Sequence, residues 1–350
     1  MEQLWPDLRV TERRNFTWLL VGIYLSGAVH LSKIAGKMTS RAKLVSLTRR
    51  LSRFLSSPAL CVRKRYRPIV VQLLETQAKA GEIRLVLDTT KVGFRHRMLM
   101  VALAYQRRTL PIAWTWVKQI KGHSLARVQL ALLAHVHRWV PAKASVLAVG
   151  DCEFGAMDVL QQLDTWEWTY VLRRESKHLL DLTLHNHWQR FGDIVDRPGQ
   201  SVWLGRSFLT KRHVYAVNLL ARWERDYDEP WLLATHLPCR RAALRAYRRR
   251  MWIEEMFGDV KGHGFNLEDS HLSHFLRLSR LTVAVVLLYV WLVVLGSRTI
   301  KNGLRSLVDR TDRQNLSIFR IGYNTAERRL ANAQPLSIMF VPYSWGQAVG

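Results

Sequence analysis

A long apolar run near the C-terminal end limits the folds open to this chain. Leu281–Leu295 holds fifteen residues without a charge. A helix that crosses a membrane needs about 20 apolar residues, and Arg277, Arg280 and Arg298 lie close to the two ends of the run. We therefore expect a helix buried in a protein core, and no membrane segment. The chain has 350 residues, 48% of them hydrophobic, which is enough to surround such a helix with two or three packed units.

A second apolar run, Phe16–Val29, follows two arginines as in a secretory signal. Acidic residues precede it and no small-residue cleavage site follows cleanly, so we expect a buried helix there as well. The three cysteines, Cys61, Cys152 and Cys239, lie far apart in the chain. Their number and spacing exclude a disulfide framework and a Cys-rich zinc site, which favours a cytoplasmic protein.

The chain is strongly basic, with 53 Lys and Arg against 27 Asp and Glu and a net charge of +26. Such an excess indicates a polyanionic partner, either nucleic acid or an acidic membrane, and argues against an ordinary small-molecule enzyme. Between Lys33 and Leu74 there is no acidic residue, whereas eleven cations fall in that span. Leu47, Leu51 and Leu55 repeat at helical spacing there, so the cations decorate folded helices.

We therefore predict a helical DNA-binding domain over residues 1–80, with a break at Gly27 that resembles a helix–turn–helix arrangement. The alternative is a basic face that is merely solvated. We also expect the rest of the chain to fold without residues 1–75. The predicted DNA contacts of this domain include Arg49, Arg50 and Arg53.

From residue 81 the hydrophobic pattern changes to that of strands. Strands are predicted at residues 83–88, 99–105, 110–117 and 144–149, and helices at residues 125–139 and 155–163. In chain order this gives strand, strand, strand, helix, strand, helix. That is the order of a ribonuclease-H-like α+β core, in which a mixed sheet is flanked by helices.

The predicted division of the chain follows these changes in pattern. The first part of the core covers residues 81–164, after the helical domain at 1–80. Residues 165–238 are rich in Trp, Tyr and β-branched residues and are predicted to form a β-rich insertion subdomain. The core resumes over 239–300 with two long helices, and residues 301–350 form a C-terminal helical segment and tail.

Two aspartates stand at the predicted ends of apolar strands, where open sheets place much of their chemistry. Asp88 closes the strand at 83–87, and Asp151 follows the strand at 146–149. Each also has an ordinary structural explanation, because Asp88 can begin a turn and Asp151 can cap the next helix.

The helix predicted after the insertion carries a row of four polar residues: Tyr247, Arg250, Glu254 and Lys261. Their spacings of 3, 4 and 7 residues place them on one narrow stripe, at about 100° per residue. Glu255 leaves that stripe and is the weaker candidate. The plain alternative is an exposed face with i,i+4 ion pairs. The opposite face, expected to pack on the sheet, holds Trp252, Ile253, Met256 and Val260.

Three carboxylates, two from strand ends and one from a helix, can together hold two divalent cations. Mg²⁺ prefers oxygen ligands, and two such ions can activate an attacking water and stabilise the leaving oxygen of a phosphodiester. We therefore predict Asp88, Asp151 and Glu254 as catalytic residues and metal ligands, with Mg²⁺ that Mn²⁺ can replace. Arg250 and Lys261 would bind DNA phosphates beside them.

The pattern Tyr247-x2-Arg250-x3-Glu254-x6-Lys261 resembles the Y-(2)-R-(3)-E-(6)-K signature of the DDE transposases of bacterial insertion sequences. The two strand-end aspartates resemble the pair that this family carries. The order of helical region, core and β-rich insertion is similar to that of the family, and residues 317–322 resemble its C-terminal segment. The likeness therefore extends over most of the chain.

The resemblance implies cut-and-paste transposition of an insertion sequence in the bacterial cytoplasm, at the nucleoid. A homodimer would act on paired terminal inverted repeats, cleave strands with water, and let the freed 3′-hydroxyl attack target DNA, often through a hairpin at the transposon end. By this likeness Asp88, Asp151 and Glu254 hold the metal ions. The implied contacts to the transposon end are Tyr247, Arg250, Lys261 and a tryptophan that stacks at a flipped base, either Trp231 or Trp223.

Other readings of the sequence stay open. Competing functions are a ribonuclease-H-like nuclease without strand transfer, a non-catalytic DNA-binding relative and, from the apolar runs, a membrane protein. The sequence has no Gly-rich phosphate loop, so we expect no use of ATP. Cys152 stands where many relatives have a basic residue, and it has no evident histidine partner. Two histidine pairs lack a third metal ligand, namely His135 with His137 and His185 with His187.

Overall fold

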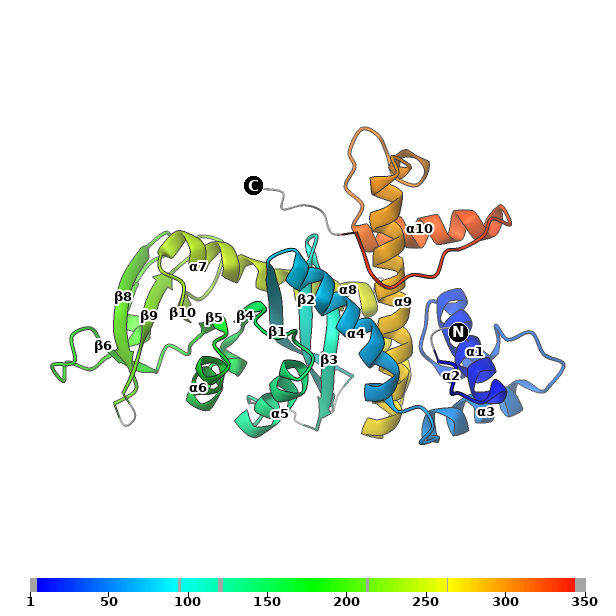
Figure 1. Ribbon diagram of the computed structural model, residues 1–350, viewed down its shortest axis with the longest axis horizontal. Helices are drawn as coiled ribbons and strands as arrows, with labels where there is room; N and C mark the ends of the chain where they lie inside the picture. Colours follow the sequence, from blue (N-terminus) through cyan, green and yellow to red (C-terminus); the bar gives the residue numbers. More distant parts are fainter. Residues whose placement is uncertain (1–4, 94–95, 119–121, 212–213, 263, 344–350) are drawn as a thin grey trace.

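One large sheet and one long helix organise the protein (Figure 1). The computed structural model describes residues 5–93, 96–118, 122–211, 214–262 and 264–343. Within these residues, ten strands form a single mixed sheet that is flanked by helices. The prediction of a mixed α+β protein is confirmed at this level.

The helices are α1 (Val10–Ser26), α2 (Leu31–Ala35), α3 (Leu44–Ser56), α4 (Val62–Lys79), α5 (Ala126–His137), α6 (Met157–Thr165), α7 (Arg240–Tyr247), α8 (Met251–Val260), α9 (Phe275–Lys301) and α10 (Ile318–Ala331). The strands are β1 (Glu82–Val92), β2 (His96–Tyr105), β3 (Arg108–Val117), β4 (Ser145–Gly150), β5 (Thr169–Arg173), β6 (Leu179–Asp181), β7 (Gln189–Arg190), β8 (Ser201–Leu209), β9 (Tyr215–Arg222) and β10 (Trp231–Thr235). Short 3₁₀ turns are η1 (Cys152–Phe154), η2 (Phe191–Ile194), η3 (Arg248–Arg250), η4 (Leu267–Ser270) and η5 (Arg305–Leu307).

The sheet has the strand order β3-β2-β1-β4-β5-β10-β9-β8-β6-β7. β1 is antiparallel to β2 and parallel to β4, and β4 is parallel to β5. All pairs from β10 outward are antiparallel. Residues 165–238, predicted as a β-rich insertion subdomain, do contain the six strands β5 to β10. The structure differs from the prediction in that β5 pairs with β4 of the core, and β10, β9 and β8 extend the same sheet. The pattern of side chains identifies a strand but not its partner, which explains the misplaced boundary.

β1 is longer than predicted and runs four residues beyond Asp88, to Val92. The β-branched residues after Asp88 continue the strand, and their pairing with β2 extends to Val92 opposite His96. The β2–β3 hairpin closes through Gln106 and Arg107, which both have positive φ, 48° and 61°. Such a two-residue turn matches the natural twist of the two strands. Asp88 is thus a residue within a strand, and the expectation that it ends the strand is wrong.

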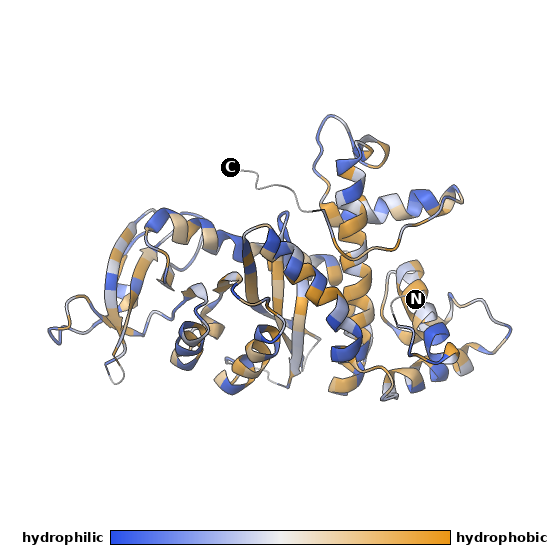
Figure 2. Cartoon of the chain, viewed as in Figure 1, coloured by the Kyte–Doolittle hydropathy of each residue, from blue (hydrophilic) through white to orange (hydrophobic). Residues whose placement is uncertain are grey.

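Helix α9 is the buried helix that the apolar run predicts. It is the one helix of the described residues that is long and apolar enough to cross a membrane, yet 83% of its most apolar 18-residue window is buried inside the protein. Figure 2 shows it as mostly hydrophobic along its middle. It packs against α1, α3, α4, α10 and β3. Its apolar surface is therefore used by the core of this chain.

The N-terminal helices belong to the same core. α1 ends at Ser26, and the following Gly27, with a φ of 57°, reverses the chain before α2, so the predicted break is confirmed. Arg280 of α9 donates to the carbonyl oxygen of Leu55 at 2.9 Å, and the Tyr66 hydroxyl donates to Pro111 O at 2.6 Å. Because α1, α3 and α4 pack on α9, removal of residues 1–75 would expose part of the apolar surface of α9. The expectation that the remaining chain folds without these residues stays a prediction, and this packing argues against it.

The C-terminal segment crosses α9 at close range. A Cβ on Gly296 would lie 2.0 Å from Ile318 O, and one on Gly322 would lie 1.8 Å from Leu292 O, so only glycine permits this crossing. The following chain runs back along α9, where Trp291 Nε1 donates to Ser337 O at 2.9 Å. Residues 344–350 of the predicted tail lie outside the described residues.

Candidate active site

The parallel pairing of β1 with β4 brings two acidic residues together. In this register Leu87 stands opposite Gly150, so the next residues along the two strands, Asp88 and Asp151, are neighbours. Asp88 is 8% exposed and accepts a hydrogen bond from the Thr89 backbone N–H at 2.7 Å. Burial raises the pKa of Asp88 to about 7, with further contributions from Asp151 and Glu254, although Arg250 and the Thr89 N–H oppose the shift.

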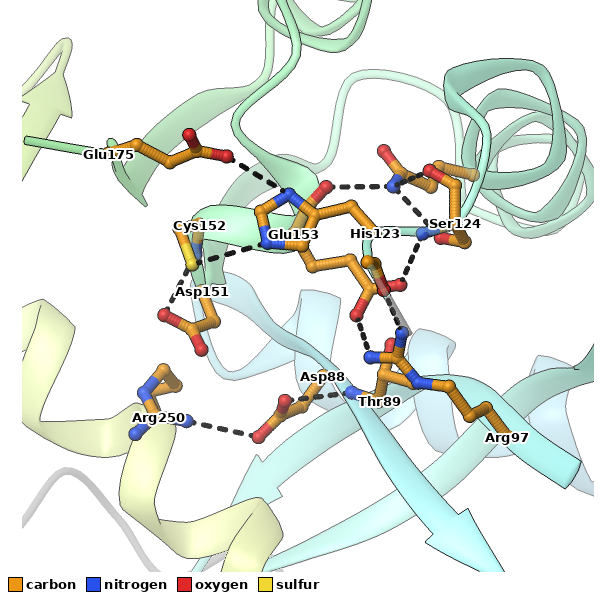
Figure 3. A network of polar contacts seen from close by, with 12 residues as sticks. Asp88, Thr89, Arg97, His123, Ser124, Asp151, Cys152, Glu153, Glu175 and Arg250 are labelled. Carbon is orange, nitrogen blue, oxygen red and sulfur yellow. Dashed lines mark hydrogen bonds and ion pairs between the residues drawn. The ribbon is translucent and has the colours of Figure 1, made fainter. Parts of the chain in front are cut away.

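Arg250 joins Asp88 to the third predicted ligand, Glu254. Figure 3 shows its contact with Asp88. Its Nη1 lies 3.1 Å from Asp88 Oδ2, and its Nη2 lies 2.7 Å from Glu254 Oε1. The arginine side chain is 12% exposed, whereas that of Glu254 is 45% exposed. Glu255 turns away and pairs with Arg108 at 3.2 Å. Glu254, not Glu255, is therefore the glutamate linked to Asp88.

Arg173 lies at the same edge of the sheet, although the sequence did not predict it as a site residue. Gly150 pairs with Leu172 in parallel, so Arg173 at the end of β5 is the neighbour of Asp151. Its Nη1 lies 3.8 Å from Asp151 Oδ1, and its Nη2 lies 2.9 Å from Glu229 Oε2. A basic residue at the end of an apolar strand could have indicated a site residue, but only if the pairing of β5 with β4 were known.

Two predicted DNA contacts point into the protein. Tyr247 is 2% exposed and Trp231 is 5% exposed, and their rings pack edge to face with centroids 5.1 Å apart. The helix predicted over residues 241–260 is divided by the 3₁₀ turn η3, in which residues three apart lie on the same side, so Tyr247 stays on the side of Arg250. Burial raises the pKa of Tyr247, and the nearby charges of Arg250 and Asp151 also act on it. Tyr247 thus lies beside Arg250 as predicted, but buried and not exposed to DNA. Trp223 is partly exposed, and its Nε1 donates to Tyr227 O at 2.9 Å.

The remaining predicted residues fall in two places. Lys261 follows α8, where its Nζ donates to Lys91 O at 2.6 Å and lies 3.0 Å from Glu268 Oε1. It thus ties α8 to the end of β1. The three arginines of the N-terminal region lie on α3. They are Arg49 and Arg53, both exposed, and Arg50, which stacks 4.5 Å from the Trp18 ring. Figure 1 shows α3 on the other side of α9 from β1 and β4.

The opposite face of α8 behaves largely as predicted. Ile253, Met256 and Val260 are buried at 0%, 0% and 3% exposure. Trp252 is only partly buried. The predicted histidine pair on α5 makes aromatic contacts, since His135 packs against Trp139 with centroids 4.1 Å apart and His137 stacks on Trp166 at 4.4 Å.

The turn after Asp151 contains a contact that the sequence did not reveal. Cys152 Sγ lies 3.8 Å from His123 Nε2, and His123 Nδ1 lies 3.3 Å from Glu175 Oε1 (Figure 3). Cys152 therefore has a histidine neighbour after all. Burial and the nearby Asp151 raise the pKa of the Cys152 thiol to about 11, so the thiol is protonated at neutral pH and is a poor nucleophile.

The donor set of this site suits a hard cation, but a guanidinium now lies within it. Asp88, Asp151 and Glu254 offer only oxygen ligands, as Mg²⁺ prefers. Among the described residues, no group of three or more His, Cys, Asp or Glu side chains is gathered tightly enough to hold a metal ion. Arg250 stands between Asp88 and Glu254 and separates them. The residues fit a metal only after this guanidinium moves.

Comparison with known proteins gives a distant structural likeness. No protein-family model matches this chain, and no curated protein matches it. The chain is similar in structure to a piggyBac transposase in a synaptic complex with hairpin DNA. The TM-score is 0.42 and the identity 10%, over 98% of this chain and 79% of that chain. A likeness at this distance does not assign the chain to a family.

Proposed function

We propose that this protein is a DNA transposase of the DDE type, with a ribonuclease-H-like core, that moves an insertion sequence by a cut-and-paste route. It would cleave strands at the element ends with water and then join the 3′-hydroxyl to target DNA. The observation that carries the proposal is the placement of Asp88 beside Asp151 by the β1–β4 register, with Glu254 linked to Asp88 through Arg250. The spacing of Tyr247, Arg250, Glu254 and Lys261 supports it from the sequence.

Asp88, Asp151 and Glu254 would hold Mg²⁺, or Mn²⁺ in its place. When bound, such ions activate the attacking water or hydroxyl and stabilise the leaving oxygen of a phosphodiester. Arg250 neutralises Asp88 and Glu254 in the metal-free state, since it contacts both at hydrogen-bond distance. Once displaced, its planar fork would be available to a DNA phosphate beside the carboxylates.

Two further cations frame the same edge of the sheet. Arg173 lies next to Asp151 and also pairs with Glu229, so it could contact a phosphate beside Asp151. Lys261 keeps the end of α8 against β1 and offers a point charge near Lys91. The carboxylates are thus surrounded by groups that can orient a DNA backbone, which is the main requirement of phosphoryl transfer.

Double-stranded DNA is the proposed partner, as terminal inverted repeats and as target. The exposed arginines Arg49 and Arg53 on α3 support a second contact surface for duplex DNA, distant from the carboxylates. A protein with a net charge of +26 would bind DNA with a strong dependence on salt. We propose a homodimer on paired ends, without ATP, in the bacterial cytoplasm.

The test is cleavage and joining of a duplex that carries the terminal repeat of the element, in Mg²⁺. Glu254→Gln should bind this duplex but not cleave it, whereas the matched control Glu255→Gln should cleave like the wild type. Cleavage without joining would favour a nuclease. Binding without cleavage by the wild type would favour a non-catalytic DNA-binding protein, and full activity of Glu254→Gln would remove that residue from the site.

A further inference from the structure

A buried polar cluster holds the turn that follows Asp151. Its centre is Glu153, which is 7% exposed and lies two residues after Asp151 in the 3₁₀ turn η1. Glu153 Oε2 lies 2.6 Å from Arg97 Nη2, and Glu153 Oε1 accepts from the Ser124 backbone N–H at 3.0 Å. Figure 3 shows these contacts beside the two aspartates. Both carboxylate oxygens of Glu153 therefore have partners within the protein.

The same cluster fixes three separate segments of chain. Arg97 comes from β2 and also donates from Nη1 to Gly122 O, before α5. Gln129 of α5 is 1% exposed, and its Nε2 donates to Glu153 O at 2.7 Å and to Ser124 O at 3.0 Å. β2, the segment before α5 and the turn after β4 are therefore locked to one another through Glu153.

Packing brings the turn against β5 as well. A Cβ on Gly155 would lie 2.6 Å from Arg173 O, so only glycine lets η1 approach the end of β5 this closely. Asp151 begins this turn, and its carboxylate accepts from the Cys152 backbone N–H at 2.8 Å. A change in the path of η1 therefore moves Asp151 relative to Asp88, which is anchored separately in β1.

We propose that Glu153, with Arg97 and Gln129, positions Asp151 for metal binding. This inference rests on the proposed function, because it assumes that Asp151 is a metal ligand. A buried ion pair is a weak source of stability, since an apolar pair of similar size is often as stable, and a role in fixing geometry is its better-attested use. Groups that orient metal ligands from behind are needed for affinity, and their loss typically costs about 10–100-fold.

The experiment is calorimetric titration of the full protein with Mn²⁺, together with thermal unfolding. Arg97→Met combined with Glu153→Gln removes both buried charges and keeps an acceptor for the Ser124 N–H. It should weaken Mn²⁺ binding about tenfold or more. Arg97→Lys keeps a positive charge beside Glu153 but cannot also reach Gly122 O. Its Mn²⁺ affinity should lie between that of the double variant and that of the wild type.

A matched control removes a partly buried ion pair from another part of the chain, in which the aspartate is buried. Arg305 and Asp309 lie 2.7 Å apart after α9, and Arg305→Met with Asp309→Asn should lower the unfolding temperature without changing Mn²⁺ affinity. DNA binding in EDTA should be the same in all these variants, because the duplex contacts do not involve Glu153.

Wild-type Mn²⁺ affinity in the folded double variant would overturn the inference. If the double variant does not fold, the Mn²⁺ affinities of Arg97→Lys and Gln129→Leu test the inference instead. Wild-type affinity in both would overturn the inference as well. Asp151→Asn separates this failure from that of the proposed function. If Asp151→Asn binds Mn²⁺ like the wild type, or the wild type does not bind it, the proposed function fails and this inference with it.

Discussion

The two sides of the carboxylate site are built differently. On the β4 side, Glu153 and Arg97 are both largely buried, and their pair is surrounded by backbone contacts from three segments. On the α8 side, Glu254 is 45% exposed and is joined to Asp88 only through the Arg250 side chain. A buried, multiply bonded pair keeps one geometry, whereas a single guanidinium can leave. We infer that the position of Asp151 is fixed before a metal binds, and that Glu254 becomes a metal ligand only when Arg250 moves.

The largest expected effect on cleavage comes from Asp151, on the β4 side. Asp151→Asn keeps the size of the side chain and an oxygen for the Cys152 N–H, but removes the charge that a metal needs. Because loss of a supporting residue alone costs about 10–100-fold, cleavage should fall more than about a hundredfold. Single-turnover cleavage with saturating duplex measures it. Cleavage within a few-fold of wild type would remove Asp151 from the reaction.

On the movable side, Arg250→Gln should make metal binding stronger. The substitution removes a cation that contacts Asp88 and Glu254, and repulsion between like charges about 4 Å apart is worth about 1–4 kcal/mol at intermediate to high dielectric. Mn²⁺ should therefore bind about tenfold more tightly without DNA, while binding of the cleavage-ready end weakens. The control is Arg248→Gln, whose arginine pairs with Glu224 instead. Equal or weaker Mn²⁺ binding by Arg250→Gln would contradict a movable guanidinium.

Metal binding should also depend on pH through Asp88. Its pKa is raised to about 7 by burial, so the folded protein holds a proton there that the unfolded chain releases near 4. The contribution of Asp88 to the free energy of unfolding therefore falls as pH rises from 4 to 7. Below pH 7, a metal that binds to Asp88 must displace the proton of this carboxyl group. Mn²⁺ affinity should rise up to about tenfold per pH unit below pH 7 and then level off. The rise should be smaller in Asp88→Asn, and an unchanged slope in that variant would assign the proton elsewhere.

The smallest effect is expected at Tyr247. Its hydroxyl is buried and has no hydrogen-bond partner within the described residues, and a buried unsatisfied polar group costs about 1–3 kcal/mol. Tyr247→Phe should leave the unfolding temperature unchanged or raise it slightly. Thermal unfolding checks stability, and end cleavage checks function. Normal stability with impaired cleavage would show that the hydroxyl becomes exposed to DNA during the reaction.

Local patterns predicted most of the elements and the three carboxylates. The strands and helices around Asp88, Asp151 and Glu254 follow from hydrophobic periodicity, which depends only on neighbouring residues. The place of β5 beside β4 could not be predicted in this way, because strand pairing is a contact between distant segments. Arg173 was missed for the same reason.

The burial of Tyr247 and the role of Glu153 were also beyond the sequence. Helical spacing places Tyr247 on the side of Arg250, but it does not show that Trp231, from a distant strand, covers the tyrosine ring. Glu153 follows Asp151 so closely that either could have been a ligand on chemistry alone. Only its buried contact with Arg97 distinguishes the two.

The most direct test of the account is a crystal structure of the full protein with its terminal-repeat duplex, grown with Mn²⁺ and measured at the manganese absorption edge. We predict anomalous peaks between Asp88, Asp151 and Glu254, with the Arg250 guanidinium moved onto a DNA phosphate. Manganese at another place, or no manganese with Arg250 still bridging Asp88 and Glu254 in the presence of DNA, would contradict the account.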